Sequence, residues 1–400
     1  MRILVADKLP PHASARLRAT GADVIVEASL RDEALTERIA ALEPNVLIVR
    51  STKVGAAQLE ASEALALVIR AGAGVNTIDT AAAAGRAIHV ANCPGKNADA
   101  VAELTFALLL AIDRMIPEAA LDLRGGHWDK ARFGKARGLK GRTLGLLGLG
   151  GIGAEVARRA AAFGMPVVAW SRSLTPERAA AMGVRRCDSP EDVARRCDIL
   201  SAHLALTPDT RGSVGEAVLQ ALPAGAVVIN TSRAEIVDAA ALLRALDERG
   251  LWAGLDVFPD EPGASEGAFT SALAQHPRVV GTPHIGASTE QSESAVADEA
   301  CRIVEEWMRT GVVHNSVNLS KRSGADHLIV VRHYDRVGVL AGVLAAIREA
   351  DHNVQEMENV LFSGGMAAAA HIQVRGCPSD DLVRAIRQVP EVFSVRVRPR

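Results

Sequence analysis

The segment LGLLGLGGIGAEVARRAAAFG, residues 144–164, constrains the fold more than any other part of the sequence. An apolar run ends at Gly148, and Gly150, Gly151 and Gly153 follow before an Ala-rich helical pattern. In such a strand–turn–helix, the first glycine makes the turn, the second lets the backbone approach a pyrophosphate and the third packs helix against strand. The spacing predicts a dinucleotide site at the start of a helix near Ile152. A tight turn without a ligand is the alternative.

The next predicted strand, residues 166–170, ends before Ser171 and Arg172. An acidic residue that binds the ribose hydroxyls of NAD would be expected at this position, whereas an arginine can accommodate the 2′-phosphate of NADP. The sequence therefore predicts NAD as cofactor with NADP as a second option. It also leaves open that Arg172 is an ordinary surface residue.

Composition excludes several classes of function. The 400 residues are 48% hydrophobic and 23% charged, with a net charge of −2, so no basic surface for nucleic acid is expected. The longest apolar run, residues 104–112, is too short to span a membrane. The five cysteines include no Cys-x-x-Cys pair, which argues against a disulfide framework and a metal site and favours a cytoplasmic location.

Apolar runs alternate with helical patterns over residues 1–95 and again over 143–285, which is typical of doubly wound parallel sheets. A long helix is expected over 99–115 and a polar linker over 321–326. Residues 326–400 show the order βαββαβ of a ferredoxin-like domain. We therefore expect an α/β protein with two Rossmann-like lobes and a third, smaller domain. The expected strands of the two lobes are residues 2–6, 24–27, 46–49, 65–69, 143–148, 166–170, 198–204, 226–230 and 252–257.

Three fragments downstream each follow a predicted strand: INTSRAEIVD (229–238), GLDVFPDEP (254–262) and GTPHIGAS (281–288). Ligands bind at the carboxyl edge of such sheets, so the side chains in these fragments are expected to converge there. They include an arginine suited to a carboxylate and a histidine whose pKa lies near neutrality. The candidate residues are Arg233, Asp256, Glu261 and His284.

With IRAGAGVNTID (69–79) and NADAVAELTFALLL (97–110), these fragments resemble the D-isomer-specific 2-hydroxyacid dehydrogenases over nearly all of residues 1–320. The resemblance implies hydride transfer between NAD or NADP and a small 2-hydroxy acid. Ala205 and Ala234 stand where the family usually has Pro and Gly, which puts the local loop geometry in doubt.

The resemblance assigns roles to individual residues. It implies that His284 is the general acid/base, that Glu261 orients its ring and that Arg233 binds the substrate carboxylate. Further contacts are implied with the cofactor from Asp256, His203 and Thr231, and with the substrate from Gly72, Gly74 and Asn97. It also divides the chain into a substrate-binding lobe, residues 1–96 and 286–320, a dinucleotide-binding lobe, residues 97–285, and a domain from 326 to 400.

Two stretches narrow the substrate. VRSTKV (49–54) resembles the phosphate-binding stretch of the 3-phosphoglycerate dehydrogenase branch, one residue shorter, and implies phosphate contacts from Arg50 and Ser51 with Arg70 nearby. GGHWDKARF (125–133) resembles the segment with which a neighbouring subunit reaches across, where Lys130 and Arg132 would add positive charge. A surface loop is the alternative. The implied reaction is oxidation of 3-phosphoglycerate on the route to L-serine.

The C-terminal stretch HYDRVGVLAGVLAAIREADHNVQEM (333–357) resembles the ACT regulatory domain. The resemblance implies an L-serine effector site near His333, Asp335 and Asn353, although Asp335 replaces an Asn and Val337 a Pro. A domain that only oligomerises is the alternative. A homodimer or homotetramer is expected.

Two other functions remain open at this point. The Ser171–Arg172 pair favours a glyoxylate/hydroxypyruvate reductase that prefers NADPH. A non-catalytic NAD-sensing corepressor or scaffold could keep the same residues on the same fold.

Overall fold

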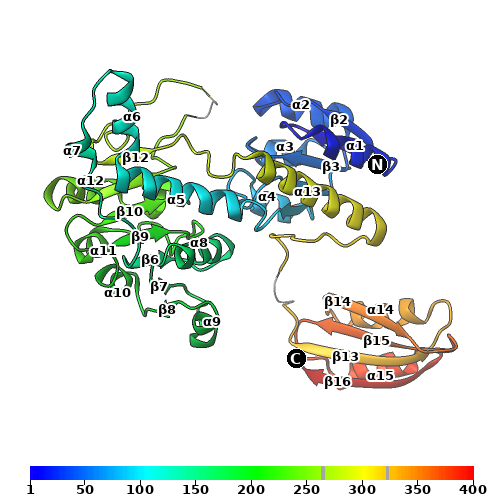
Figure 1. Ribbon diagram of the computed structural model, residues 1–400. Coiled ribbons are helices and arrows are strands. Elements are labelled where there is room, and N and C mark those ends of the chain that lie inside the picture. Colours follow the sequence, from blue (N-terminus) through cyan, green and yellow to red (C-terminus); the bar gives the residue numbers. More distant parts are fainter. Residues whose placement is uncertain (263–265, 321–323) are drawn as a thin grey trace. The chain divides into compact units, whose positions relative to one another are not determined.

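The computed structural model describes residues 1–262, 266–320 and 324–400 (Figure 1). The chain divides into two compact units, Met1–Asn318 and Leu319–Arg400, each described here by itself. Half of the expected linker, residues 321–323, lies outside the described residues. Within the described part of the chain, no helix is long and apolar enough to cross a membrane.

The first sheet of the large unit has five parallel strands in the order β2-β1-β3-β4-β5. Its strands are short runs of Val, Ile and Leu, and alternate side chains enter the cores on its two faces. Helices α1 and α13 pack against one core, and α2, α3 and α4 against the other. The strands are β1 (Arg2–Val5), β2 (Asp23–Val26), β3 (Val46–Val49), β4 (Leu67–Arg70) and β5 (His89–Asn92); the helices are α1 (Pro11–Ala19), α2 (Asp32–Leu42), α3 (Ala56–Glu60), α4 (Thr80–Gly85) and α13 (Glu290–Thr310).

The second sheet has seven parallel strands in the order β12-β11-β10-β9-β6-β7-β8. The order reverses between β6 and β9, which is the position where ligands bind in such sheets. The strands are β6 (Leu144–Leu147), β7 (Val167–Trp170), β8 (Arg185–Arg186), β9 (Ile199–Ala202), β10 (Val227–Asn230), β11 (Trp252–Leu255) and β12 (Val279–Gly281).

Helices cover both faces of this second sheet. Helices α5 and α8 pack in the core on one face, and α10, α11 and α12 in the core on the other. The helices are α5 (Ala98–Arg114), α6 (Ile116–Arg124), α7 (Lys130–Phe133), α8 (Gly151–Ala162), α9 (Pro176–Ala181), α10 (Pro190–Arg195), α11 (Glu216–Ala221), the 3-10 helix η1 (Ala234–Ile236) and α12 (Ala239–Glu248). The predicted α/β class with parallel sheets is therefore confirmed.

The small unit has the predicted order βαββαβ and a separate antiparallel sheet, β14-β15-β13-β16. Helices α14 and α15 pack on one face of the sheet (Figure 1), where their side chains share a core with alternate residues of the strands. The elements are β13 (His327–Tyr334), α14 (Val339–Glu349), β14 (Val354–Leu361), β15 (Ala367–Val374), α15 (Asp380–Gln388) and β16 (Val392–Pro399).

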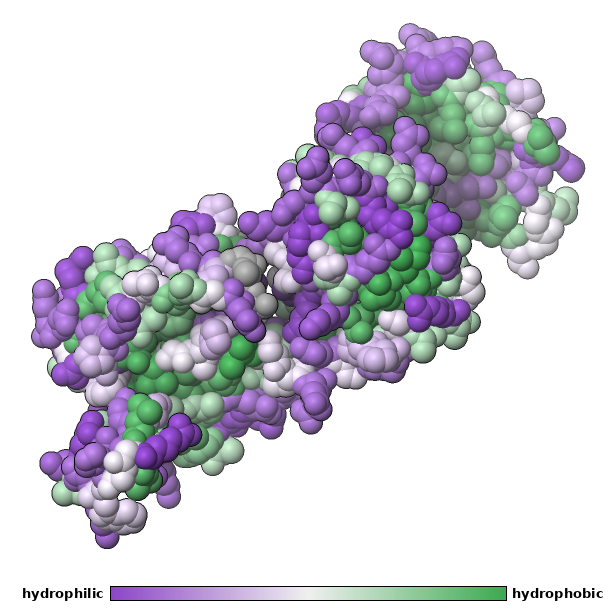
Figure 2. Space-filling model, turned by 90° about the horizontal axis from the view of Figure 1, so that it is seen from above, coloured by the Kyte–Doolittle hydropathy of each residue, from purple (hydrophilic) through white to green (hydrophobic). Residues whose placement is uncertain are grey.

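The surface carries both polar and apolar side chains. On the face shown in Figure 2, apolar patches lie between groups of hydrophilic residues. Four of the cysteines are buried, Cys377 is exposed, and all five are free thiols.

A core substitution should show whether the small unit has a core of its own. Ile347 on α14 is 1% exposed, whereas Leu344 on the same helix is 36% exposed. Ile347→Ala should lower the free energy of unfolding of residues 319–400 by about 2–5 kcal/mol, because a cavity is left among packed side chains. Calorimetry of the full chain measures this. A loss no larger than that of the control, Leu344→Ala, would contradict this description of the core.

Candidate active site

In the glycine-rich turn between β6 and α8, backbone segments lie so close together at two positions that side chains would not fit. Gly148 has φ +96°, and a Cβ there would lie 2.5 Å from the carbonyl oxygen of His203. A Cβ at Gly153 would lie 2.2 Å from the carbonyl oxygen of Gly148, whereas one at Gly150 would meet nothing within 4 Å. Helix α8 has no side-chain cap at its N-terminus. The N–H groups in the first turn of α8 therefore have no side-chain acceptor, and Gly150 leaves space beside them. An anion such as a pyrophosphate could bind there.

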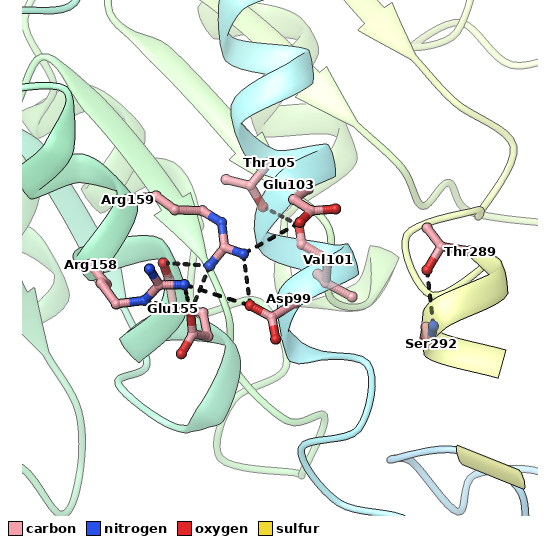
Figure 3. A network of polar contacts seen from close by, with 9 residues as sticks. All are labelled: Asp99, Val101, Glu103, Thr105, Glu155, Arg158, Arg159, Thr289 and Ser292. Carbon is pink, nitrogen blue, oxygen red and sulfur yellow. Dashed lines mark hydrogen bonds and ion pairs between the residues drawn. The ribbon is translucent and has the colours of Figure 1, made fainter. Parts of the chain in front are cut away.

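A network of charges links α8 to α5 (Figure 3). Arg159 Nη2 lies 2.7 Å from Asp99 Oδ1, and Arg159 Nη1 lies 2.6 Å from Glu155 Oε2. Behind it, the rings of Phe106 and Phe163 stack with centroids 5.0 Å apart. These contacts fix the helix that begins at Gly151, and Ile152 packs against the core beneath it.

Other predicted cofactor residues lie at neighbouring strand ends. Ser171 is half-buried after β7, while the Arg172 side chain is 81% exposed and its Nη1 lies 3.8 Å from Asp209 Oδ2. His203 Nε2 lies 2.9 Å from Ser201 Oγ, and burial lowers the pKa of His203 to about 4. Its Nδ1 is buried without a partner among the described residues. Thr231 Oγ1 lies 3.1 Å from Thr105 Oγ1 inside the protein.

Arg233 is held by the loop after β10. Asn230 Nδ2 donates to the Arg233 carbonyl at 2.8 Å, and Asn230 Oδ1 accepts from Ser232 N–H at 3.0 Å and from its hydroxyl at 2.7 Å. A Cβ at Gly74 would lie 2.5 Å from Arg233 Nη2. The guanidinium therefore reaches the loop that follows β4, and a side chain at position 74 would displace it from there.

His284 and Glu261 form a hydrogen-bonded pair. His284 Nδ1 lies 2.7 Å from Glu261 Oε2, and Glu261 Oε1 accepts from Phe258 N–H at 2.8 Å. The bond to Glu261 raises the pKa of His284 despite partial burial. Burial raises the pKa of Glu261, but the bonds from His284 and Phe258 outweigh it, so that pKa is lowered. Because Nδ1 faces Glu261, Nε2 is the nitrogen left to exchange a proton.

Asp256 orders the loop that carries His284. Its buried carboxylate accepts from Thr282 Oγ1 at 2.6 Å, Ile285 N–H at 2.8 Å and Gly286 N–H at 2.8 Å. Its carbonyl accepts from His284 N–H at 2.8 Å, and His284 itself has φ +53°. Burial raises the pKa of Asp256. The carboxylate predicted to meet the cofactor is thus already bonded to the loop beneath His284.

A cationic pocket lies at the ends of β1, β3 and β4, against α13. Arg70 is half-buried, and its partial burial together with the charges of Arg233 and Arg50 lowers its pKa to about 10. Arg50 Nη1 pairs with Glu293 Oε1 at 2.7 Å. Asn97 Oδ1 is buried and has no hydrogen-bond partner within the described ranges. The polar and glycine residues that line the pocket are Lys8, Arg50, Arg70, Gly72, Asn97, Ser292 and Glu293.

Two residues of this region were missed by the sequence analysis. Lys8 lines the pocket, and Asp7 organises the loop that carries Arg50. Asp7 Oδ2 accepts from the N–H groups of Arg50 at 2.7 Å, Ser51 at 3.1 Å and Thr52 at 3.0 Å, and Ser51 Oγ donates to Oδ1. Both residues follow the first strand, at the edge where ligands bind, but this position alone is a weak signal because no motif accompanies it.

Some predicted substrate and effector residues lie apart from this cluster. Arg132, in α7, pairs with Asp122 at 3.1 Å, and neither Arg132 nor the exposed Lys130 lines the pocket. In the small unit, His333 is buried, and its Nε2 lies 3.2 Å from Asn359 Oδ1.

The three predicted effector residues do not meet within one chain. His333 pairs with Ala368 near one end of the sheet, whereas Val354, next to Asn353, pairs with Val374 at the other. Asp335 follows β13 at the His333 end. A site that includes all three residues would need a second copy of this unit.

Comparison with known proteins places this geometry in context. Residues 106–286 match the family described as D-isomer specific 2-hydroxyacid dehydrogenase, NAD binding domain. The chain is 38% identical over 321 residues to a D-3-phosphoglycerate dehydrogenase of Methanocaldococcus jannaschii, covering 80% of this chain and 60% of that protein. The chain therefore spans less than two thirds of that curated relative. The family match confirms NAD as the predicted cofactor.

Two solved structures are similar to an equally large share of the chain. An NAD⁺-bound 3-phosphoglycerate dehydrogenase of Entamoeba histolytica is 30% identical with a TM-score of 0.66, covering 80% of this chain and 99% of that one. An NADPH-dependent glyoxylate/hydroxypyruvate reductase of Sinorhizobium meliloti is 30% identical with a TM-score of 0.67, covering the same shares.

The Glu261–His284 bond can be tested directly. Glu261→Gln should lower the pKa of His284, because the main cause of its raised value is lost while the burial that opposes it remains. Titration of the His284 ring by NMR measures this. Asp260→Asn, at the neighbouring carboxylate, is the control and should leave the value unchanged. An unaltered pKa in Glu261→Gln would show that the bond does not control the ring.

Proposed function

We propose that this chain, which belongs to the family of D-isomer-specific 2-hydroxyacid dehydrogenases, oxidises the 2-hydroxyl of 3-phosphoglycerate to give 3-phosphohydroxypyruvate, with NAD as the cofactor. The observation that carries this proposal is the convergence of Arg233 and the Glu261–His284 pair with a pocket lined by Lys8, Arg50 and Arg70. A proton acceptor thus lies in a region with binding groups for two anions.

Each residue has a role in the reaction that follows from the chemistry of its side chain. Arg233 binds the substrate carboxylate and polarises the reacting oxygen. His284 Nε2 takes the proton of the 2-hydroxyl, and Glu261 stabilises the imidazolium that forms. NAD bound at the glycine-rich turn would supply the acceptor for the hydride that leaves C2. In the reverse reaction His284 returns the proton to the oxygen.

The cationic pocket supports a phosphorylated substrate. Arg70 is half-buried near two other arginines, so an anion there would relieve their mutual repulsion. Arg50 is paired with Glu293, and a phosphate would compete with that carboxylate for the guanidinium. In this proposal residues 1–96 and 286–320 form the substrate-binding lobe and 97–285 the dinucleotide-binding lobe.

The dinucleotide lobe fits a bound NAD at its glycine-rich turn. The open side of Gly150 and the uncapped start of α8 would receive the pyrophosphate. The highly exposed Arg172, weakly paired with Asp209, is available to a 2′-phosphate, and this observation favours the second candidate, an NADPH-dependent glyoxylate/hydroxypyruvate reductase.

The small unit is proposed to be an ACT regulatory domain. Its βαββαβ order and antiparallel sheet support this assignment. Because His333 and Asn353 lie at opposite ends of one sheet, L-serine would bind where two copies meet, in a homodimer or homotetramer.

One steady-state assay separates the candidates. It compares 3-phosphoglycerate, D-glycerate and D-lactate with NAD and NADP, and glyoxylate and hydroxypyruvate with NADH and NADPH. The proposal requires the highest kcat/KM for 3-phosphoglycerate with NAD. Preference for glyoxylate or hydroxypyruvate with NADPH would establish the reductase instead. No turnover of any pair would point to the non-catalytic scaffold.

Loss of Arg50 should affect phosphorylated substrates alone. Arg50→Ala should raise KM for 3-phosphoglycerate roughly tenfold to a hundredfold, the size of a lost charge-assisted bond, and leave D-glycerate kinetics little changed. Glu293→Gln is the matched control, because it frees Arg50 from its ion pair and should not raise KM. Equal losses for the two substrates would show that Arg50 does not contact the phosphate.

A further inference from the structure

The sheet of the small unit has one open face. On β13, the buried residues Ile329 and Val331 belong to the core under α14 and α15. The residues that alternate with them along the strand point to the opposite face. The strand register extends this alternation across the sheet. The open face therefore carries Leu328, Val330, Arg332, Tyr334, Glu356, Glu358, Val360, Ala369, His371, Gln373, Arg396 and Arg398.

The strand register places the acidic and the basic residues of two rows on opposite edge strands of the open face. One row across the four strands reads Glu356, Gln373, Leu328 and Arg398. The next reads Glu358, His371, Val330 and Arg396. In both rows the acid lies on edge strand β14 and the arginine on edge strand β16.

The acids and arginines of these rows cannot pair within one sheet. Three strand spacings separate them, about 14 Å. The side chains of Glu356, Glu358, Arg396 and Arg398 are all exposed, and none makes an ion pair within the parts of the chain that the structure describes. The charged side chains on both edge strands are therefore able to form ion pairs with another molecule.

Between the two edges the face is mixed. Leu328 and Val330 on β13 are half-buried, and Val360 on edge strand β14 is 38% exposed, whereas Arg332, His371 and Gln373 bring polar groups to the two central strands. The rings of Tyr334 and Phe393 lie 5.2 Å apart and are 46% and 51% exposed. Exposed apolar side chains beside polar ones, between charged edges, agree with the composition of non-obligate protein interfaces.

We propose that a second copy of this chain stacks on the open face, related by a two-fold axis parallel to the strands. Such an axis places β14 of one copy opposite β16 of the other. It also keeps each row at the same position along the strand direction in both copies. Glu356 then faces Arg398 of the second copy, and Glu358 faces its Arg396; each contact occurs twice. A two-fold axis across the strands would instead oppose acid to acid and arginine to arginine.

The size of the face sets the strength of the contact. Four strands of eight residues cover about 500 Å² per copy, so a dimer buries about 1,000 Å², the lower limit for a specific interface. In an interface of that size, the four ion pairs determine whether the dimer forms. Association should therefore weaken as the salt concentration is raised. This inference does not depend on the reaction proposed above.

Charge reversal in the full chain tests the proposal. Glu356→Arg/Glu358→Arg makes both edges basic, and Arg396→Glu/Arg398→Glu makes both acidic, so each variant repels itself. Sedimentation should show each variant alone with half the wild-type assembly mass and a dissociation constant for this contact raised roughly tenfold or more. An equimolar mixture should regain the wild-type mass, because every basic row then faces an acidic one.

The control is Arg348→Glu/Arg384→Glu, which makes the same change in charge on the exposed side of the two helices. It should keep the wild-type mass. Unaltered mass in both face variants, or halved mass that mixing does not restore, would overturn the proposal. Far-UV circular dichroism of each variant identifies one that has failed to fold, and restoration on mixing can come only from folded chains.

Discussion

The buried carboxylate of Asp256 is the constraint on which the candidate site depends. It collects the Thr282 hydroxyl and two loop N–H groups, and its own carbonyl holds the N–H of His284. A charge so deeply buried is tolerated only with such bonds, so the loop has little freedom. Asp7 and Asn230 serve the loops of Arg50 and Arg233 in the same way. All three lie at the carboxyl end of a strand or directly after it.

The loops around the pocket bring three arginines together. Burial and the charges of Arg233 and Arg50 lower the pKa of Arg70 to about 10, and Asp7 opposes that shift. Glu293 pairs with Arg50. In the proposed function, a substrate with two anionic groups would be bound by these arginines, and the Glu261–His284 pair near Arg233 would face its reacting carbon.

The strongest sequence patterns located the parallel sheets, whereas the roles of the site residues stay predictions. The nine expected strands occur within one or two residues of their predicted positions, but β5, β8 and β12 were missed because they are short or polar, as RR at 185–186 is. Arg233 and Glu261 follow predicted strands, whereas His284 follows β12, which was missed, and its role came from the resemblance. Lys8 was missed because a single lysine after a strand carries no motif. The separation of His333 from Asn353 depends on strand register, which spacing alone does not give.

The central claim is that His284 moves the proton of the reaction. The most direct measurement is kcat of His284→Gln with 3-phosphoglycerate and NAD, together with the affinity for NADH from fluorescence titration. General acid/base help contributes roughly 10²–10⁴-fold, so kcat should fall by that factor while NADH binds as in the wild type. Turnover within a few-fold of the wild type, with NADH affinity unchanged, would contradict the account.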